Sequence, residues 1–531
     1  LFISGLRRGG EVMAQRIVGR RAVSLALAGS VAGLAVPLAR TSRAAEAPKG
    51  LGTVTMAFST DLLTLDGSQN VMTNHRIVFK HLYDPLVTLD SGFAVQPALA
   101  ERWEHVDPLT WRFHLRPGVM FQNGEPFTAD AVRLAVEQSR LPTAQSRSTL
   151  SIIKDVVVRD DHTVDLVTAT PYANTLVQIA DCLFPIPPRY YASAGPAEFG
   201  RNPIGTGPYK FESWRRGDRI TLARNDGWWK GRPKADRVVF WAVPEASTRV
   251  AAVLSGDADI AGQVPPVQTG RIKGSGRAAV VASESGVQPI FGGIMFERPP
   301  FNDLRVRQAL NYAVNRKAIV DRLLLGYGKP MGQFCPTGVV GYNPDVSPFP
   351  YDPARARALL KEAGVETLKM SIEAPIGIVP QASEVCQVIA QNLQQVGITA
   401  EVKLDEYPVF SAKLFDFAHH QQTLGDLFLM YYKAGPTAEY VVDEMTGSTQ
   451  GWNWSHYNNP RADALWEKWQ SEFDPERRKS YLMQIEQIGR DDAPWLVLYE
   501  PQSLWGISNA LTWAPRNDDM IHVEDLQPRS V

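Results

Sequence analysis

The stretch from Gln96 to Val132 constrains the fold of this chain more than any other part of it. Its segment Thr110–Arg116, TWRFHLR, alternates apolar and polar side chains with a period of two, which is typical of a β-strand with one buried face. Turns follow at Pro117-Gly118 and Asn123-Gly124, and Thr128-Ala129-Asp130 is then expected to cap a helix. The stretch therefore predicts a strand, a hairpin and a helix in succession.

Residues 1–44 have the organisation of an export signal peptide. Arg16, Arg20 and Arg21 precede Ala22–Leu38, a run without charged residues, and small residues lead to Ala44. This order predicts cleavage and export. A membrane anchor is the disfavoured alternative, because a span needs about 20 strongly apolar residues and this run is rich in Ala, Gly and Ser.

The export route stays open between two pathways. The pair Arg20-Arg21 and the weak hydrophobicity favour a twin-arginine signal, whereas Gly19 stands where a Ser or Thr would be expected. Met13 is the expected true start, and the mature chain is expected to begin near Ala45.

The mature chain carries a mild negative charge. Residues 1–44 hold seven Arg and one Glu, and the remaining 48 basic and 55 acidic residues give a net charge of −7. This balance argues against a nucleic-acid partner. Cys182, Cys335 and Cys386 lie far from the signal, so a lipid anchor is excluded. We expect these cysteines to be buried and free, since they permit one disulfide at most and their spacing selects no pair.

The chain changes character near residue 268. Before that point short alternating segments predict strands at Thr53–Phe58, Asp155–Val158, Thr163–Val167, Arg219–Ala223 and Val238–Trp241. After it, amphipathic helices alternate with strands, which indicates an α/β domain with a largely parallel sheet. The predicted helices are Leu304–Leu325, Pro353–Glu362 and Ser383–Val396, and the predicted strands are Leu368–Ile372, Thr399–Leu404, Trp495–Leu498 and Leu504–Ile507. Gly364 and Gly397 are placed to end two of the helices.

Six blocks of sequence resemble, in the same order, the family 5 solute-binding proteins of ABC transporters (the oligopeptide, dipeptide and nickel group). The blocks are His81–Val87, Gln96–Val132, Asn202–Tyr209, Ala246–Ile260, Arg298–Val314 and Trp454–Leu465. The resemblance implies an α/β, periplasmic-binding-protein type II-like two-lobe flytrap. Lobe I would comprise residues 50–268 and 495–531, with an extra subdomain at about 81–184, and lobe II would comprise 269–494.

No catalytic constellation stands out in the sequence. The Gly-x-Ser-x-Gly, His-Glu-x-x-His and Cys-x-x-Cys motifs are absent. Gly205-Thr206-Gly207-Pro208-Tyr209 lacks the residues of a phosphate-binding loop and reads as a turn, and the adjacent His419-His420 would point to different faces. We therefore predict no catalytic residues, no metal and no cofactor.

The resemblance places the ligand site by position. Peptide-binding relatives carry, in the segment that is Gly425–Tyr440 here, an Asp that pairs with the peptide's ammonium group. This chain has Tyr431-Tyr432-Lys433 nearby and no such acid, which favours a ligand with a carboxylate at Lys433. The other candidates supply polar groups or rigid aromatic walls, and they are Ser59, Thr60, Asp61, Gln381, Tyr407, Trp452 and Trp454.

The resemblance implies a soluble, monomeric periplasmic subunit of an ABC importer. It would capture its solute by lobe closure and deliver it to a permease served by separate ATPase subunits. Peptides or peptide-like solutes are the first expectation. Opine-like or other carboxylated nitrogenous solutes and a nickel or metal chelate are the alternatives, and an enzyme or scaffold on the same fold is a remote one.

Overall fold

The computed structural model describes residues 51–529, with gaps at 70–72, 143, 287, 417–422, 432–434 and 436–452. The predicted signal peptide, His419-His420, Tyr432, Lys433 and Trp452 lie outside the described residues. Within them, no helix combines the length and the hydrophobicity that a membrane span requires.

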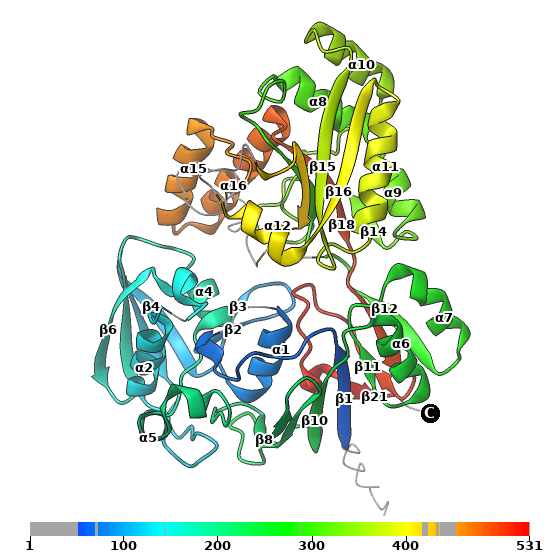
Figure 1. Ribbon diagram of the computed structural model, residues 1–531. Coiled ribbons are helices and arrows are strands. Elements are labelled where there is room, and N and C mark those ends of the chain that lie inside the picture. The colour runs from blue at the N-terminus through cyan, green and yellow to red at the C-terminus, as the bar shows by residue number, and fades with distance from the viewer. Residues whose placement is uncertain are drawn as a thin grey trace, which may run out of the picture. The chain divides into compact units, whose positions relative to one another are not determined.

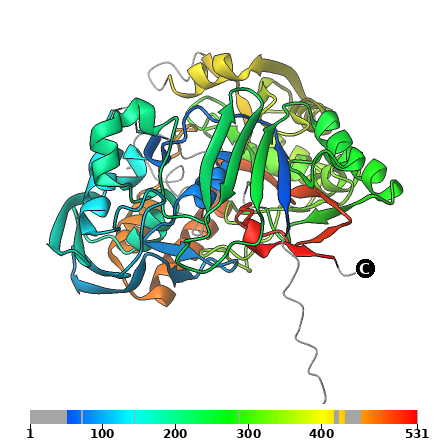
Figure 2. The same cartoon turned by 90° about the horizontal axis from the view of Figure 1, so that it is seen from below.

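Two large sheets organise the chain (Figure 1). The first sheet has the order β12 (Ala278–Ala282), β19 (Leu504–Ser508), β11 (Ile260–Ala261), β1 (Thr53–Phe58), β10 (Arg237–Ala242), β9 (Arg219–Arg224) and β8 (Tyr209–Arg215). The second has the order β14 (Gly328–Pro330), β18 (Trp495–Pro501), β13 (Ile290–Ile294), β17 (Leu427–Tyr431), β15 (Leu368–Ile376) and β16 (Ile398–Glu406). In Figure 2, β1 (blue) lies beside the green strands of the first sheet, with the red C-terminal segment on its other side.

A separate four-stranded sheet lies inside the predicted extra subdomain. Its order is β4 (Ala100–Asp107), β5 (Thr110–Leu115), β7 (Thr163–Thr168) and β6 (Ile153–Asp160), and the two-stranded sheets are β2 (Val87–Leu89) with β3 (Val95–Pro97) and β20 (Leu511–Thr512) with β21 (Gln527–Pro528). Trp111, Phe113 and Leu115 of β5 are buried and alternate with half-buried residues, as the period of two predicts. They belong to a hydrophobic cluster whose buried members all lie between residues 86 and 183.

The helices between the strands cover the sheets (Figure 1). In chain order they are α1 (Thr73–Leu82), α2 (Ala129–Ser139), α3 (Arg147–Leu150), α4 (Thr175–Cys182), α5 (Pro188–Phe199), α6 (Ala246–Ser255), α7 (Thr269–Gly274), α8 (Leu304–Ala313), α9 (Arg316–Arg322), α10 (Pro353–Glu362), α11 (Ala382–Gln394), α12 (Tyr407–Leu414), α15 (Pro460–Ser471) and α16 (Pro475–Asp492).

The second sheet is buried on both faces, and β17 shows how. Leu427 and Leu429 pack with residues of α8, α9, α10 and α11, whereas Phe428 and Met430 pack with residues of α12, α15 and α16. A strand covered on both faces needs apolar residues at every position, because successive side chains point to opposite sides. This explains the unbroken apolar run LFLMY in β17.

One predicted helix is wrong. The segment Leu304–Leu325 forms two helices, α8 and α9, because Val314 is extended (φ −97°, ψ 122°) and the Asn315 side chain accepts a hydrogen bond from Ala318 N at 2.9 Å. Asn315 therefore starts a new helix, and apolar periodicity alone did not reveal this internal cap.

The chain crosses between the two sheets later in the sequence than the predicted boundaries at 268 and 494. It leaves the first sheet after β12 and enters the second at β13, and it returns between β18 and β19. The strands before the crossings are β12 and β18. The sheet to which each belongs depends on pairing with distant strands, which a single sequence does not reveal. The division into two lobes that move about these crossings stays a prediction.

Candidate ligand-binding site

The carboxyl ends of parallel strands meet at one edge of each sheet. In the first sheet β1 runs parallel to β10 and β11, and in the second β15 runs parallel to β16 and β17. Both crossings join these same edges, since Ile290 pairs with Tyr431 and Ala282 pairs with Leu504. Ligands of open α/β sheets bind outside the carboxyl ends of the strands, so the two edges are the candidate site.

At the first edge, Ser59, Thr60 and Asp61 directly follow β1, as predicted. The Asp61 carboxylate accepts hydrogen bonds from Trp214 Nε1 at 3.1 Å and from Gly217 N at 2.7 Å. These donors lie on β8 and in the β8–β9 turn. Asp61 therefore anchors the loop after β1 to the neighbouring hairpin, and Ser59 and Thr60 are left as the candidates for ligand contact there.

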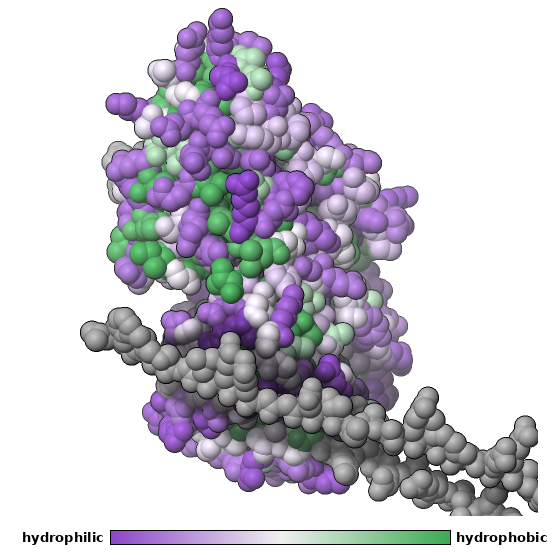
Figure 3. Space-filling view, turned by 90° about the vertical axis from the view of Figure 1, so that its right-hand side faces the viewer, coloured by the Kyte–Doolittle hydropathy of each residue, from purple (hydrophilic) through white to green (hydrophobic). Residues whose placement is uncertain are grey.

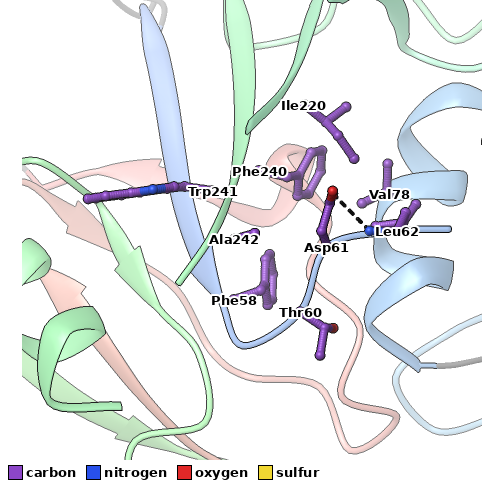
Figure 4. Close-up of a pocket in the computed structure, with 9 residues that line it drawn as sticks. All are labelled: Phe58, Thr60, Asp61, Leu62, Val78, Ile220, Phe240, Trp241 and Ala242. Carbon is purple, nitrogen blue, oxygen red and sulfur yellow. Dashed lines mark hydrogen bonds between the residues drawn. The ribbon is translucent and has the colours of Figure 1, made fainter. Parts of the chain in front are cut away.

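A small cavity lies beside this loop (Figure 4). Its volume is about 10 Å³, and Phe58, Leu62, Val78, Ile220 and Phe240 contribute apolar walls. One water molecule needs roughly that volume. The cavity is therefore a packing space behind the edge and is too small for a peptide or a sugar derivative.

Arg249 of α6 holds the remaining turns of the first edge together. Its guanidinium donates to the carbonyl oxygens of Val243 at 2.8 Å, Pro244 at 2.7 Å and Gly262 at 2.9 Å, which follow β10 and β11. The side chain is buried, and burial lowers its pKa from the usual value for arginine. The arginine acts as a structural tie between strand ends.

At the second edge, Gln381 precedes α11 in the left-handed conformation, with φ 55°. Its amide Oε1 is buried and has no hydrogen-bond partner in the described part of the chain. A buried amide oxygen without a donor is costly, on the order of 1–3 kcal/mol. Gln381 therefore holds an unpaired acceptor, and its role in ligand binding stays a prediction.

Two tyrosines come together at the same edge. Tyr407 begins α12 directly after β16 and is 38% exposed, and Tyr431 ends β17. Burial, and then the nearby Tyr407, raise the pKa of Tyr431. Ile376, at the end of β15, is 46% exposed. The edge thus combines aromatic and apolar side chains, and Figure 3 shows hydrophobic residues gathered on the lower part of the upper body, which contains the second sheet.

Lys413, a cation near this edge, is already neutralised by two carboxylates. Lys413 Nζ of α12 lies 2.5 Å from Glu373 Oε1 of β15 and 2.6 Å from Asp405 Oδ2 of β16. Glu373 is buried, its pKa is raised by burial, and it also accepts a hydrogen bond from Gly425 N at 2.6 Å. The cluster fastens α12, and with it Tyr407, to the strand ends.

The two crossings are bonded to each other. Ser283 N donates to Ser503 O at 3.0 Å, and Ser503 N donates to the Ser283 hydroxyl at 3.0 Å. Buried Glu500 accepts from Gly286 N at 3.1 Å. A Cβ on Gly286 would stand 1.7 Å from the carbonyl oxygen of Pro501, so only glycine permits this approach.

The structure brings some predicted residues together and places one elsewhere. Gln381, Tyr407 and Tyr431 meet at the second edge, whereas Ser59 and Thr60 lie at the first. Trp454 is 2% exposed and packs against Phe415 and Phe428, so it lies in the core and not on an open wall.

Sequence reasoning missed three features that hold the strand ends and the crossings together. These are Arg249, the Lys413 cluster and Gly286. Arg249 lies in a block that carries the family resemblance, which was the one available signal; Lys413 and Gly286 gave none. All three cysteines are buried and free, as expected.

Comparison with known proteins agrees with this geometry. Residues 94–454 match the family described as bacterial extracellular solute-binding proteins, family 5. The chain is 28% identical to the glutathione-binding protein GsiB of Salmonella typhi, over 86% of this chain and 91% of that protein. It is also 28% identical to the dipeptide-binding protein of Escherichia coli, over 78% and 83%.

A solved structure shows the same fold. MoaA of A. tumefaciens R10 in complex with mannopinic acid is 25% identical, with a TM-score of 0.73 over 91% of this chain and all of that one. Proteins of this family bind solutes for ABC import and are not enzymes. Because the family match extends over more than half of the sequence, the chain belongs to the family 5 bacterial extracellular solute-binding proteins.

Proposed function

We propose that this protein captures peptides or peptide-like solutes in the periplasm and delivers them to the permease of an ABC importer. Two observations together support the proposal. The chain belongs to a family of solute-binding proteins, and its two sheets have the carboxyl ends of their parallel strands at the edges that the crossings join. The relatives named for glutathione and dipeptides support a peptide ligand. The aromatic side chains of Tyr407 and Tyr431 and the unpaired amide oxygen of Gln381 suit a ligand with both apolar and hydrogen-bonding groups.

A second candidate is an opine-like, carboxylated nitrogenous solute. The similarity to MoaA in complex with mannopinic acid favours it. The predicted anchor Lys433, which lies outside the described residues, would serve either class, because a free carboxylate is common to both.

Binding to a panel of probes tests the proposal. The mature chain, from residue 45, would be unfolded and refolded to remove carried ligand and then titrated with di-, tri- and tetra-alanine, glutathione and mannopinic acid. A ligand at a hundred times its Kd adds about 2.7 kcal/mol of stability, which a melting curve detects readily. Calorimetry then gives the Kd. Binding of mannopinic acid alone would select the second candidate, and no binding to any probe would refute both.

The proposed mechanism is closure of the two sheet regions about the crossings at residues 283–289 and 502–503. A ligand that contacts both edges favours the closed form by its difference in affinity for the two forms. Small-angle scattering should show a smaller radius of gyration with a saturating probe. An unchanged radius with a bound probe would contradict closure while leaving the binding function intact.

Export through the signal peptide is part of the same proposal. N-terminal sequencing of the periplasmic protein should find a start near Ala45. Replacement of Arg20 and Arg21 by lysine should block export if the twin-arginine route is used, and normal export of that variant would select the general secretory route.

A further inference from the structure

Arg219 and Trp241 form a stacked pair at the first strand edge. Arg219 is the first residue of β9 and stands directly opposite Trp241 of β10, so both side chains lie on the same face of the sheet. The guanidinium carbon lies 4.5 Å from the centroid of the indole ring. A guanidinium at this distance over the ring is attracted to its electron-rich face.

The pair belongs to the carboxyl end of the sheet. Trp241 is paired with Ala57, two residues before Ser59, and the turn that precedes Arg219 is the one to which Asp61 is anchored. Figure 4 shows Trp241 projecting from β10 on the side opposite to Phe240 and away from the small cavity. The indole packs against Ala57, Val243, Ala252 and Ala258, which makes it a rigid support for the arginine.

The donors of Arg219 are not used by a strong partner. Its Nε is buried and makes no hydrogen bond with any residue that the structure describes. The carboxylate of Asp218 is 3.6 Å away, beyond hydrogen-bond distance, and it is also paired with Arg215. The Arg219 side chain is nevertheless 40% exposed, so a solute can reach it.

The second edge offers a contrasting cation. Lys413 is already held by Glu373 and Asp405, so its charge has two partners before any ligand arrives. Arg219 has a planar fork of N–H donors, which matches the two oxygens of a carboxylate. Its fixed position on Trp241 reduces the entropy that binding would cost.

We propose that Arg219, held on Trp241, binds a carboxylate of the captured solute. The substrate class is then narrowed to peptides and peptide-like solutes with a free carboxylate, which face the first edge with that group and the second edge with their apolar parts. The inference rests on the proposed function and names a residue that sets specificity within it.

Calorimetry on paired probes tests the inference. Tri-alanine and glutathione would be compared with tri-alanine amide and glutathione ethyl ester, using wild-type protein, Arg219→Gln and Arg219→Lys. For the acids, Arg219→Gln should raise Kd by about tenfold to a hundredfold, the loss of charge-assisted hydrogen bonds. Arg219→Lys should recover part of the affinity, since it keeps the charge and loses the planar fork.

The decisive quantity is the penalty for blocking the carboxylate, which is the Kd of the amide or ester divided by the Kd of the corresponding acid. It should be large in the wild-type protein and close to onefold in Arg219→Gln, because the group that reads the carboxylate is then gone. An equal penalty in both proteins would overturn the inference and place the carboxylate elsewhere, with Lys433 as the next candidate. An unchanged Kd for the acids in Arg219→Gln would overturn it as well.

Arg232→Gln is the matched control. Arg232 is 69% exposed in the connection between β9 and β10, at the opposite edge of the same sheet, and its loss changes the net charge equally. It should leave every Kd within about twofold. Melting curves of the empty variants establish that each is folded. A wild-type protein that binds neither acid would instead refute the peptide function, and with it the inference.

Discussion

The two sheet edges are built by different means, although both collect the carboxyl ends of parallel strands. The first is polar and braced from within, since Asp61 ties β1 to the next hairpin and Arg249 ties the turns after β10 and β11. The second is aromatic, with Tyr407 close enough to Tyr431 to influence its pKa, and the charge of Lys413 is neutralised there. The difference teaches that neither edge alone suits a solute that is charged at one end and apolar at the other.

The largest expected effect concerns the joint between the two regions. Gly286→Ala forces a Cβ to within 1.7 Å of a backbone oxygen of the other crossing, and backbone cannot move aside cheaply. We expect the free energy of unfolding to fall by about 4 kcal/mol in urea titrations followed by tryptophan fluorescence.

Gly270→Ala in α7 is the control for that change, because a Cβ there meets nothing within 4 Å. It should be neutral or stabilising by up to about 1 kcal/mol. Equal effects of the two substitutions would show that the crossings are not closely packed against each other. The crossings would then not hold the two edges in a fixed relation.

The next prediction compares the ties of the two edges. Arg249→Met leaves several buried carbonyl oxygens without a donor and should cost about 3 kcal/mol. Lys413→Met should cost less, about 2 kcal/mol, because the lysine side chain is 29% exposed and Glu373 can take up a proton. Urea titrations at neutral pH measure both. A larger loss of unfolding free energy for Lys413→Met would contradict the view that the first edge depends more on its buried arginine than the second edge does on its lysine.

Each region also holds a buried carboxyl group with its own pH window. Burial raises the pKa of Glu486, in α16, to about 7, and that of Asp519, near the C-terminus, to about 6. A carboxyl whose pKa is raised on folding binds more protons in the folded state, so stability falls as pH rises. The fall should run from about pH 4.5 to 7 for Glu486 and from about pH 3.8 to 6 for Asp519, by on the order of 3 kcal/mol each.

Two substitutions separate these windows. Glu486→Gln should remove the slope of the unfolding free energy between pH 6 and 7, and Asp519→Asn should flatten it chiefly between pH 4 and 6. Urea titrations at closely spaced pH values are the measurement. A slope between pH 6 and 7 that survives Glu486→Gln would show that this carboxyl is already ionised when folded.

The smallest effect compares two helix starts. Asn459 accepts a hydrogen bond from Arg461 N at 2.9 Å at the start of α15, so Asn459→Ala should cost about 1 kcal/mol. Thr128 has the extended backbone of a cap before α2, but its side chain makes no capping hydrogen bond. Thr128→Ala should therefore change the unfolding free energy by less than about 0.5 kcal/mol. A comparable loss at both sites would contradict this distinction.

Local elements were the most predictable part of the fold. Thr53–Phe58 and Pro353–Glu362 have the predicted bounds, and Gly364 and Gly397 adopt the positive φ expected after a helix. Alternation and capping act between near neighbours, so one sequence contains all the information they need. The break at Asn315 shows the limit, because a short internal cap interrupts an apolar pattern without changing its period.

The candidate site was predicted less completely than the fold. Gln381, Tyr407 and Tyr431 follow or end strands of one sheet, and the family resemblance located them. Asp61 was predicted to contact ligand, yet its carboxylate is occupied by Trp214 and Gly217, 153 and 156 residues away. Whether a polar group is available depends on such distant donors, which no local pattern reports.

The sequence by itself determined the family and the strand and helix segments, because these follow from short-range periodicity and from motifs in a fixed order. Only the tertiary structure decided where the chain crosses between sheets, which charges are neutralised and that Arg219 lies on Trp241. Those properties depend on strand pairing between distant segments, such as Ile290 with Tyr431 and Ala282 with Leu504. Pairing is selected by the burial of both faces of each sheet at once, and that condition belongs to the folded chain as a whole.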